Sequence, residues 1–319
     1  MRVALITCRQ LPEPDPDQEP LLVALRQRGV DAVMHAWDGD GTLDGFDLGI
    51  LRSCWNYHLE PERFLAWLDA ADRSTRLLNP TPVLRWNLHK RYLQELGSRG
   101  LPVVPTVFVE RGAARRSAEQ PGTVRCKASA TTDDSCRSAT PSFAAILDEH
   151  GWSRAVIKPS VSAASFRTRV FARDEAEPAQ AFLAELLLDR DAMVQRYVPS
   201  VEQAGEKALV WIDGEWTHGV HKRPRFQGDD EQVSPAVPLD DRECALGARA
   251  LATVGDGLLY ARLDVISDDN GELLVSELEL LEPSLFLQQH PPALQRLSDA
   301  IAGWGRSDTR ARSRPAVSE

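Results

Sequence analysis

Two β-rich runs that carry acidic residues flank Asn270-Gly271, a dipeptide typical of a two-residue type I′ hairpin turn. With that turn, Asp264 lies opposite Glu277, and Arg262 lies opposite Glu279. All four side chains then share one face of the hairpin, because side chains alternate along a strand. Crowded carboxylates repel one another unless a cation lies among them, and hard oxygen ligands suit Mg²⁺. The pattern therefore predicts a magnesium site on this hairpin.

A solvated hairpin face is the alternative interpretation, since charged side chains also gather on surfaces that face water. The flanking sequence favours a cleft instead. Apolar residues precede the hairpin at 258–260 and follow it at 280–281 and 285–287. A polar cluster between such runs lines a cleft more readily than it faces open solvent.

Composition narrows the class of protein. The 319 residues are enough for two or three domains. The net charge of −10 argues against nucleic acid or an anionic membrane surface as a main partner. The N-terminal apolar run is too short for a signal peptide, and no window is long enough for a transmembrane helix. Five scattered cysteines without a C-x-x-C pattern indicate reduced thiols and a cytoplasmic protein.

The first fifty residues predict a small parallel sheet that could position a substrate. Strands are expected over 2–7, 30–36 and 46–52, with a helix over 21–28 between the first two. Ligands of such sheets approach the carboxyl ends of the strands, where Arg52 and Asn56 stand. Arg52 could therefore clamp a substrate carboxylate, with an ordinary surface arginine as the alternative.

The rest of the chain alternates helices and strands. Helices are expected over 61–71, 82–96, 175–188, 240–253 and 292–303. Strands are expected over 103–109, 155–158, 169–171, 193–198, 208–212 and 215–221. Residues 110–140 lack periodicity and indicate a mobile insertion, and the polar tail 304–319 is expected to be disordered.

Motifs of other enzyme classes are missing from the sequence. It contains neither the P-loop pattern nor G-x-S-x-G. His218 and His221 are three residues apart on an expected strand, so they point to opposite faces and a shared zinc site is not predicted.

Six short motifs follow one another along the chain: Lys90 late in a helix, I-K-P at 157–159, Q-R-Y-V at 195–198, G-E at 205–206, R-L-D at 262–264 and E-L-E at 277–279. In this order they resemble the ATP-grasp superfamily, the fold of D-alanine–D-alanine ligase, glutathione synthetase and ribosomal-protein glutamate ligases. Three local stretches, R-S-C-W-N-Y-H, W-N-x-x-K and E-L-E-L-L-E-P-S-L-F, most resemble the branch that contains the O-ureido-serine cyclo-ligase of cycloserine biosynthesis. The resemblance covers roughly residues 83–303, with residues 1–80 similar to a pre-grasp domain.

This resemblance implies a fold and its divisions. An α/β protein is expected, with α+β grasp lobes behind a parallel-sheet pre-grasp domain. The expected boundaries are 1–82 for the pre-grasp domain, 83–193 for the N-lobe with the insertion 110–140, 194–303 for the C-lobe, and 304–319 for the tail.

It also implies roles for individual residues. Lys90 and Lys158 would bind the ATP phosphates, Gln195, Arg196, Tyr197 and Val198 the adenine, and Glu206 the ribose. Asp264, Glu277 and Glu279 would bind Mg²⁺, and Arg262 with Lys158 would act on the transferred phosphoryl group. Arg52, Asn56, Lys222 and Arg225 would contact the substrate.

Two positions depart from the family pattern. Glu279 stands where the family often has Asn, and the glutamate adds negative charge to the expected metal site. The phosphate-covering loop 160–166 contains no glycine, so its closure is expected to be stiffer.

The implied function is an ATP-dependent, ADP-forming ligase that joins a small amino-acid-like carboxylate to an amine or related nucleophile through an acyl phosphate. A cyclo-ligase and a catalytically silent nucleotide-binding protein remain alternatives. The cofactors would be ATP and two Mg²⁺ ions, with Mn²⁺ as an alternative ion. The expected partners are small molecules, with neither nucleic acid nor a membrane, and a homodimer is an alternative to a monomer.

Overall fold

The structure is a computed structural model that describes residues 1–111, 141–223 and 232–312, with side chains as far as Trp304. Most of the predicted insertion and the substrate residue Arg225 lie outside these ranges. The chain divides into two compact units. One comprises Met1–Val103 with Val198–Glu319, and the other Val104–Tyr197. The boundaries expected at 82, 193 and 303 remain predictions.

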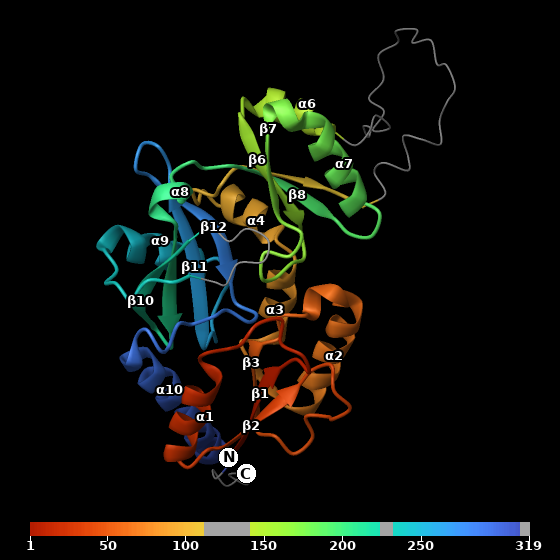
Figure 1. The fold of residues 1–319 in the computed structure, drawn as a ribbon. Helices are drawn as coiled ribbons and strands as arrows, with labels where there is room; N and C mark the ends of the chain where they lie inside the picture. Colours follow the sequence, from red (N-terminus) through yellow and green to blue (C-terminus); the bar gives the residue numbers. More distant parts are fainter. Residues whose placement is uncertain (112–140, 224–231, 313–319) are drawn as a thin grey trace, which may run out of the picture. The chain divides into compact units, whose positions relative to one another are not determined.

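The first unit begins with the predicted parallel sheet, which has the order β2-β1-β3-β4 (Figure 1). Its strands are β1 (Arg2–Thr7), β2 (Asp31–Ala36), β3 (Leu48–Ser53) and the unpredicted β4 (Arg76–Leu78). Helices α1 (Gln18–Gln27), η1 (Tyr57–Leu59) and α2 (Pro61–Ser74) connect them. The parallel pairing places the ends of β1 and β3 together, since Thr7 pairs with Ser53. Arg52 therefore lies at a carboxyl end, as predicted.

A second, antiparallel sheet completes this unit, in the order β10-β9-β11-β12. It consists of β9 (Glu206–Ile212), β10 (Glu215–Lys222), β11 (Tyr260–Ser267) and β12 (Leu273–Glu279), with α8 (Val201–Ala204) and α9 (Asp241–Leu251). One apolar core joins the two sheets, because Leu5 and Ile50 of the parallel sheet cluster with Val210 and Tyr260 of the antiparallel one. The hairpin therefore packs against the parallel sheet, and the Tyr260 hydroxyl donates to Leu51 O near the end of β3 at 2.6 Å.

The last helix of the first unit is longer than expected. Helix α10 (Pro291–Arg312) extends nine residues past the expected end at 303, so the prediction of a disordered tail is wrong as far as Arg312. It lies beside α1 in Figure 1, where Arg28 Nε donates to Asp299 Oδ1 over 2.7 Å. No helix in the described ranges has the length and apolar composition to cross a membrane.

The prediction of a single helix over 82–96 is wrong. The structure has α3 (Thr81–Leu88) and α4 (Tyr92–Ser98), separated by an extended His89 with φ −105° and ψ 122°. The break brings Lys90 beside Glu277, while the Tyr92 hydroxyl accepts a hydrogen bond from the Leu278 backbone N–H at 3.1 Å. Both contacts hold the segment against β12.

Strands β11 and β12 pair in the predicted register at the charged positions. Asp264 pairs with Glu277 and Arg262 with Glu279. Near the turn the ladder is shifted by one residue, and an irregularity beyond Asp264 restores the register. Bulges of this kind add one residue to one strand of a pair.

The turn itself differs from the predicted two-residue form. Asp268 N–H donates to Glu272 O over 2.8 Å, so three residues, 269–271, form the loop. Gly271 has φ +78°, the left-handed conformation that a three-residue hairpin loop requires. The extra loop residue and the bulge offset each other, which is why the charged pairs match the prediction although the turn does not.

The second unit is built on an antiparallel sheet in the order β5-β8-β6-β7. Its elements are β5 (Thr106–Val109), α6 (Phe143–His150), β6 (Arg154–Pro159), β7 (Arg169–Ala172), η2 (Arg173–Glu175), α7 (Ala176–Leu186) and β8 (Ala192–Arg196). Helix α6 follows the undescribed segment and was not predicted. Its Phe143 and Leu147 share an apolar core with Ile157 of β6.

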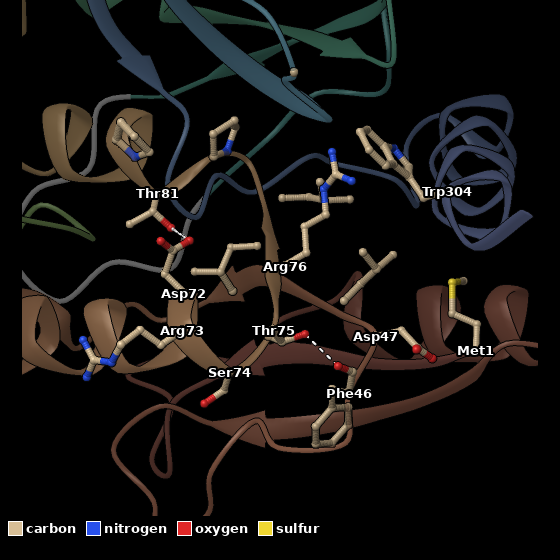
Figure 2. A pocket seen from close by; sticks show the side chains of 16 residues that line it. Met1, Phe46, Asp47, Asp72, Arg73, Ser74, Thr75, Arg76, Thr81 and Trp304 are labelled. Atoms are coloured by element: carbon tan, nitrogen blue, oxygen red, sulfur yellow. Dashed lines mark hydrogen bonds between the residues drawn. The ribbon is translucent and has the colours of Figure 1, made fainter. Parts of the chain in front are cut away.

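A cavity of about 940 Å³ lies beside the edge strand β4. Figure 2 shows Thr75 turned toward Phe46 and Asp72 toward Thr81, contacts of 2.8 and 2.5 Å that use these polar side chains within the fold. Arg76 stacks on Trp304, with its guanidinium carbon 4.4 Å from the ring centre. None of the described residues predicted to bind nucleotide, metal or substrate lines this cavity.

Candidate active site

Arg262 links two of the predicted metal ligands across the hairpin face. Its Nε lies 2.9 Å from Asp264 Oδ1, and its Nη2 lies 3.0 Å from Asp264 Oδ2 and 2.5 Å from Glu279 Oε1. Nη1 donates to the backbone oxygen of Ser284 at 3.2 Å. Both Arg262 and Asp264 are buried, so these charge-assisted hydrogen bonds are shielded from water. The arginine is therefore held in one orientation.

Lys222 brings a second cation to the same carboxylate. Its Nζ lies 2.5 Å from Asp264 Oδ2 and 2.8 Å from Glu206 Oε2. The position follows from strand pairing, because Lys222 of β10 is opposite Glu206 of β9, and Asp264 lies on the adjacent β11. Glu206 also accepts a short hydrogen bond from the Ser276 hydroxyl. The predicted ribose ligand and a predicted substrate residue are thus in direct contact.

Lys90 supplies the third cation, through the break between α3 and α4. Its Nζ donates to Glu277 Oε2 over 2.8 Å. Burial by itself would lower the pKa of Lys90, but the nearby Glu277 and Glu279 carboxylates outweigh it and raise this pKa. The lysine therefore stays charged in the interior of the unit.

In the apo protein the carboxylates do not need a metal ion to separate them. Lys90, Lys222 and Arg262 are interleaved with the acidic side chains and neutralise them. Burial would raise the pKa of Asp264, yet Arg262 and Lys222 outweigh it and hold this pKa below its usual value. Burial dominates at Glu279 and raises its pKa despite Arg262.

The three predicted metal ligands have suitable oxygen donors, but in this structure they are engaged by cationic side chains. Among the described residues, no three His, Cys, Asp or Glu side chains converge as a ready metal site. The oxygen donors of Asp264, Glu277 and Glu279 nevertheless share one buried face and have the chemistry that Mg²⁺ prefers. They fit the ion once the three cations release them.

Arg52 is buried at the end of β3 with an unsatisfied guanidinium. It is 3% exposed, and its Nη1 has no hydrogen-bond partner. The guanidinium carbon lies 5.6 Å from the centre of the Tyr260 ring. Tyr260 precedes Arg262 by two residues on β11, so Arg52 continues the charged row of that face. The alternative of an ordinary surface arginine is wrong.

Asn56, the other predicted substrate residue of this region, has its amide engaged within the fold. Its Oδ1 accepts from Trp37 Nε1 at 2.6 Å, and its Nδ2 donates to Asp38 Oδ2 at 2.8 Å. A substrate role for Asn56 remains a prediction.

One buried carboxyl of this region was not foreseen. Glu282 follows the apolar pair Leu280-Leu281, and its backbone oxygen accepts from Trp55 Nε1 at 3.1 Å. Burial and the neighbouring Glu279 raise the pKa of Glu282 well above its ordinary value, although Arg262, Lys90 and a hydrogen bond from Tyr57 oppose this. An acidic residue between a leucine pair and a proline was the available sequence signal.

Comparison with known proteins places this geometry in a family. A sequence profile described as the N-terminal domain of D-cycloserine synthetase DcsG matches residues 3–79. The crystal structure of D-cycloserine synthetase DcsG superposes with a TM-score of 0.79 and 29% identity, over 95% of this chain and 99% of that one. The cycloserine biosynthesis protein DcsG of Streptomyces lavendulae is 31% identical over 303 residues, 90% of this chain and 93% of that protein. The chain belongs to the DcsG family.

The structure superposes on DcsG and also on ATP-grasp ligases, so the predicted ATP-grasp fold is confirmed. D-alanine–D-alanine ligase from Bacillus anthracis, in a structure complexed with ATP, superposes with a TM-score of 0.63 over 97% of this chain and 99% of that one at 14% identity. The protein is therefore an ATP-dependent ligase of the ATP-grasp type.

The remaining predicted nucleotide residues of this DcsG family member lie in the second unit, apart from Val198. Lys158 is half-buried near the end of β6. Gln195 donates from Nε2 to Thr106 Oγ1 at 3.2 Å, and the Arg196 N–H donates to Pro105 O at 2.9 Å. The Tyr197 ring is covered by Arg154, whose guanidinium carbon lies 4.0 Å from the ring centre. These contacts hold residues 195–197 in place within the second unit. Their nucleotide roles remain predictions.

Proposed function

We propose that the protein phosphorylates a carboxylate of a small amino-acid-like substrate with ATP and then joins it to a nitrogen nucleophile. The observation that carries this proposal is the buried row of alternating charges on the β11–β12 face. Each of the three hairpin carboxylates there lies within 2.9 Å of at least one of the three cations. Phosphoryl transfer is catalysed chiefly by positioning and charge neutralisation, and this row can supply both.

The chemistry proceeds in two balanced steps. A carboxylate oxygen attacks the γ-phosphorus, the bond to the bridging oxygen breaks, and ADP leaves with an acyl phosphate behind. The nitrogen then attacks the acyl carbon, the C–O bond to phosphate breaks, and inorganic phosphate and one nitrogen-borne proton are released. The acyl phosphate turns a poor leaving group into a good one.

Each residue of the row has a role in this scheme. Asp264, Glu277 and Glu279 would hold two Mg²⁺ ions, or Mn²⁺ in their place, which neutralise the phosphates when bound. Arg262 would steady the transferred phosphoryl group, and Lys90 with Lys158 would bind the phosphates. Glu206 would bind the ribose and residues 195–198 the adenine.

Substrate contacts are proposed for Arg52, Asn56, Lys222 and Arg225, the last outside the described residues. Arg52 is the best supported, because its buried Nη1 lacks a partner that a substrate carboxylate would provide. The proposed partners are small molecules, and the proposed assembly is a monomer or a homodimer.

Similarity to DcsG favours the intramolecular variant of the reaction, in which one molecule supplies both the carboxylate and the nitrogen. A nucleotide-binding protein without turnover is the competing class. The presence of the lysines, Arg262 and all three carboxylates supports turnover instead.

Hydroxylamine distinguishes these possibilities, because it captures acyl phosphates as hydroxamates. The protein is incubated with ATP, Mg²⁺, hydroxylamine and a panel of small amino acids, and ADP and hydroxamate are measured. Equal amounts of both products are expected with a true substrate. A cyclo-ligase should also release ADP from a single substrate without hydroxylamine or a second amine. Nucleotide binding without ADP release across the panel would assign the protein to the silent class.

A further inference from the structure

The loop 160–168, which joins β6 to β7, has a strained backbone. It contains no glycine, yet Ala164, Ser165 and Arg167 have φ values of 49°, 54° and 47°. A residue with a β-carbon is sterically disfavoured in this left-handed region. Such a conformation persists only where the surrounding structure holds it, and conformations of this kind cluster at ligand clamps and switch segments.

A buried hydroxyl at the start of the loop is also unsatisfied. Ser160 is fully buried, and its Oγ has no hydrogen-bond partner within the described ranges. Its backbone N–H donates to Asp191 O at 2.9 Å. Buried polar atoms of native proteins nearly always have a partner. The loop is therefore incompletely satisfied in this conformation, and a second conformation that satisfies it better is expected.

Side chains at and just after the end of α7 hold the second half of the loop. Arg167 Nη2 lies 2.5 Å from Glu185 Oε1, and Arg167 Nη1 lies 3.6 Å from Asp189 Oδ1. The guanidinium carbon of Arg190 lies 5.2 Å from the centre of the Phe166 ring. Together these contacts form what we call the α7 latch, and all of its residues belong to the second unit.

The α7 latch is weak enough for a ligand to release it. Glu185 and Asp189 are 63% and 49% exposed, and ion pairs of exposed side chains contribute little to stability. A turn hydrogen bond from Phe166 N–H to Ala163 O at 3.0 Å adds to the latch. The backbone strain of three residues opposes both. A small change on either side of this balance therefore shifts the population of the loop conformations.

We propose that the α7 latch sets nucleotide affinity: it holds the loop away from the phosphates, and the loop covers them only after Arg167 leaves Glu185. Backbone strain in the latched loop favours this release. The inference rests on the proposed function, in which Lys158 at the end of β6 binds the phosphates, and on the phosphate-covering role that the family resemblance implies for this loop.

Two substitutions with opposite expected effects test the proposal. Glu185→Gln breaks the latch without changing the loop, and Ala164→Gly removes strain from the latched loop without changing the latch. The controls are Glu177→Gln, at an exposed position of the same helix, and Ala163→Gly, at the neighbouring alanine whose φ is not left-handed. Calorimetry measures the affinity of the full-length proteins for ADP with Mg²⁺ and for adenosine, which has no phosphates for the loop to cover.

Glu185→Gln should bind ADP about two- to fivefold more tightly, because an exposed ion pair no longer opposes closure of the loop. Ala164→Gly should bind ADP about fivefold more weakly, because its latched conformation is no longer strained. For the same reason it should raise the melting temperature of the ligand-free protein, which Ala163→Gly should not do. Both controls should keep the wild-type affinity for ADP, and adenosine affinity should be the same in all five proteins.

The other outcomes count against the latch. Unchanged or weaker ADP binding by Glu185→Gln, tighter binding by Ala164→Gly, or a parallel change in adenosine affinity would overturn the inference and leave the ligase function intact. Asp189→Asn loosens the longer contact of the same latch and should also tighten ADP binding, so weaker binding there would contradict the proposal too. If wild type does not bind ADP with Mg²⁺, the proposed function itself fails and the inference with it.

Discussion

Two carboxylates of the β11–β12 face, Asp264 and Glu277, each meet a cation that comes from another part of the sequence. Lys90 lies 187 residues from its partner Glu277, and Lys222 lies 42 residues from Asp264. The four side chains are at most 17% exposed, so removal of one member leaves its partner in a poorly solvating environment. Charge changes in the row should therefore affect folding as well as activity.

Replacement of Glu277 by Gln should lower both turnover and apo stability. Repulsion among the carboxylates alone would predict an unchanged or higher stability. Because Lys90 Nζ lies 2.8 Å from Glu277 Oε2, the variant instead leaves a buried lysine without its counter-ion. We expect a loss of about 1–3 kcal/mol in the free energy of unfolding and a fall of about 10²-fold or more in kcat. Urea unfolding without nucleotide measures the first quantity.

Glu272→Gln, at the exposed tip of the same hairpin, is the control and should change neither quantity. An apo stability that rises in Glu277→Gln would mean that repulsion outweighs the ion pair with Lys90.

The sequence predicted which carboxylates share the hairpin face, but it did not predict which cations pair with them. The alternation of charged and apolar residues was enough to place Asp264, Glu277 and Glu279 on one face. It could not show that Lys90 and Lys222 neutralise them, because those contacts depend on tertiary placement. The apolar flanks of Glu282 indicate burial, but its contact with Tyr57 also depends on tertiary placement.

Strands β9 and β10 hold Lys222 in place, and Gly205 sets their separation. Gly205 has φ +72°, and a β-carbon there would stand 2.4 Å from the backbone oxygen of Lys222. Gly205→Ala should therefore push the strand ends apart and move Lys222 away from Glu206 and Asp264. We expect lower stability together with weaker nucleotide affinity, measured by thermal melting and calorimetry.

Gly214→Ala separates the steric effect from the backbone effect. Gly214 has φ +90° in the turn of the same hairpin, and a β-carbon added there would meet no other atom within 4 Å. Gly214→Ala should lower the free energy of unfolding only by the cost of a left-handed alanine, about 1 kcal/mol. It should retain nucleotide affinity. Equal effects of the two variants would remove the steric argument.

Strand β10 also carries a histidine whose protonation should oppose folding. Burial, with a smaller effect of the stacked His290, lowers the pKa of His218 from 6.5 to about 4. Between these values the unfolded chain binds the proton and the folded protein does not. The stabilising contribution is complete above pH 6.5 and is lost as the pH falls toward 4, by up to about 3 kcal/mol.

His218→Gln should flatten the pH dependence of the unfolding free energy between pH 7 and pH 4. The control is His221→Gln, which changes an exposed histidine on the opposite face of the same strand and should leave the slope unchanged. A wild-type slope retained in His218→Gln would show that another group titrates.

Element types were predicted more successfully than element ends. The parallel strands over 2–7 and 46–52 and the β11–β12 hairpin were recognised from apolar runs and alternation. The division of the helix over 82–96 was not, because no Gly or Pro marks it and the break depends on contacts with β12. Helix α6 follows the aperiodic segment 110–140, and no element was predicted for its residues.

In the first unit as a whole, the outer edge of β12 is bonded by side chains from the first hundred residues. Asn87 Nδ2 donates to Leu278 O, and its Oδ1 accepts from Leu280 N–H, both at 2.7 Å. Asn87→Asp replaces the donor with an oxygen that repels Leu278 O. We expect a loss of about 1–3 kcal/mol in unfolding free energy and a lower kcat, because Glu277 and Glu279 stand on this strand.

Gln94→Glu makes the same amide-to-carboxylate change at an exposed position of α4 and serves as the control. Denaturant unfolding and steady-state ADP release provide the two measurements. An Asn87→Asp protein with wild-type stability would show that the edge bonds are dispensable.

If Lys90 binds phosphate and Glu277 binds Mg²⁺, as proposed, the ion pair between them should make the affinities for nucleotide and metal depend on each other. A divalent ion alone must take Glu277 from a lysine that then has no anion, and ATP alone must take Lys90 from a glutamate that then has no cation. Together, the two ligands exchange partners with the pair, and every charge is matched again. Thermodynamic reciprocity then requires Mg²⁺ to tighten ATP binding by the same factor as ATP tightens Mg²⁺ binding. Calorimetric titrations of each ligand at several fixed concentrations of the other should return one coupling free energy of about 1–3 kcal/mol, and Lys90→Met should reduce it.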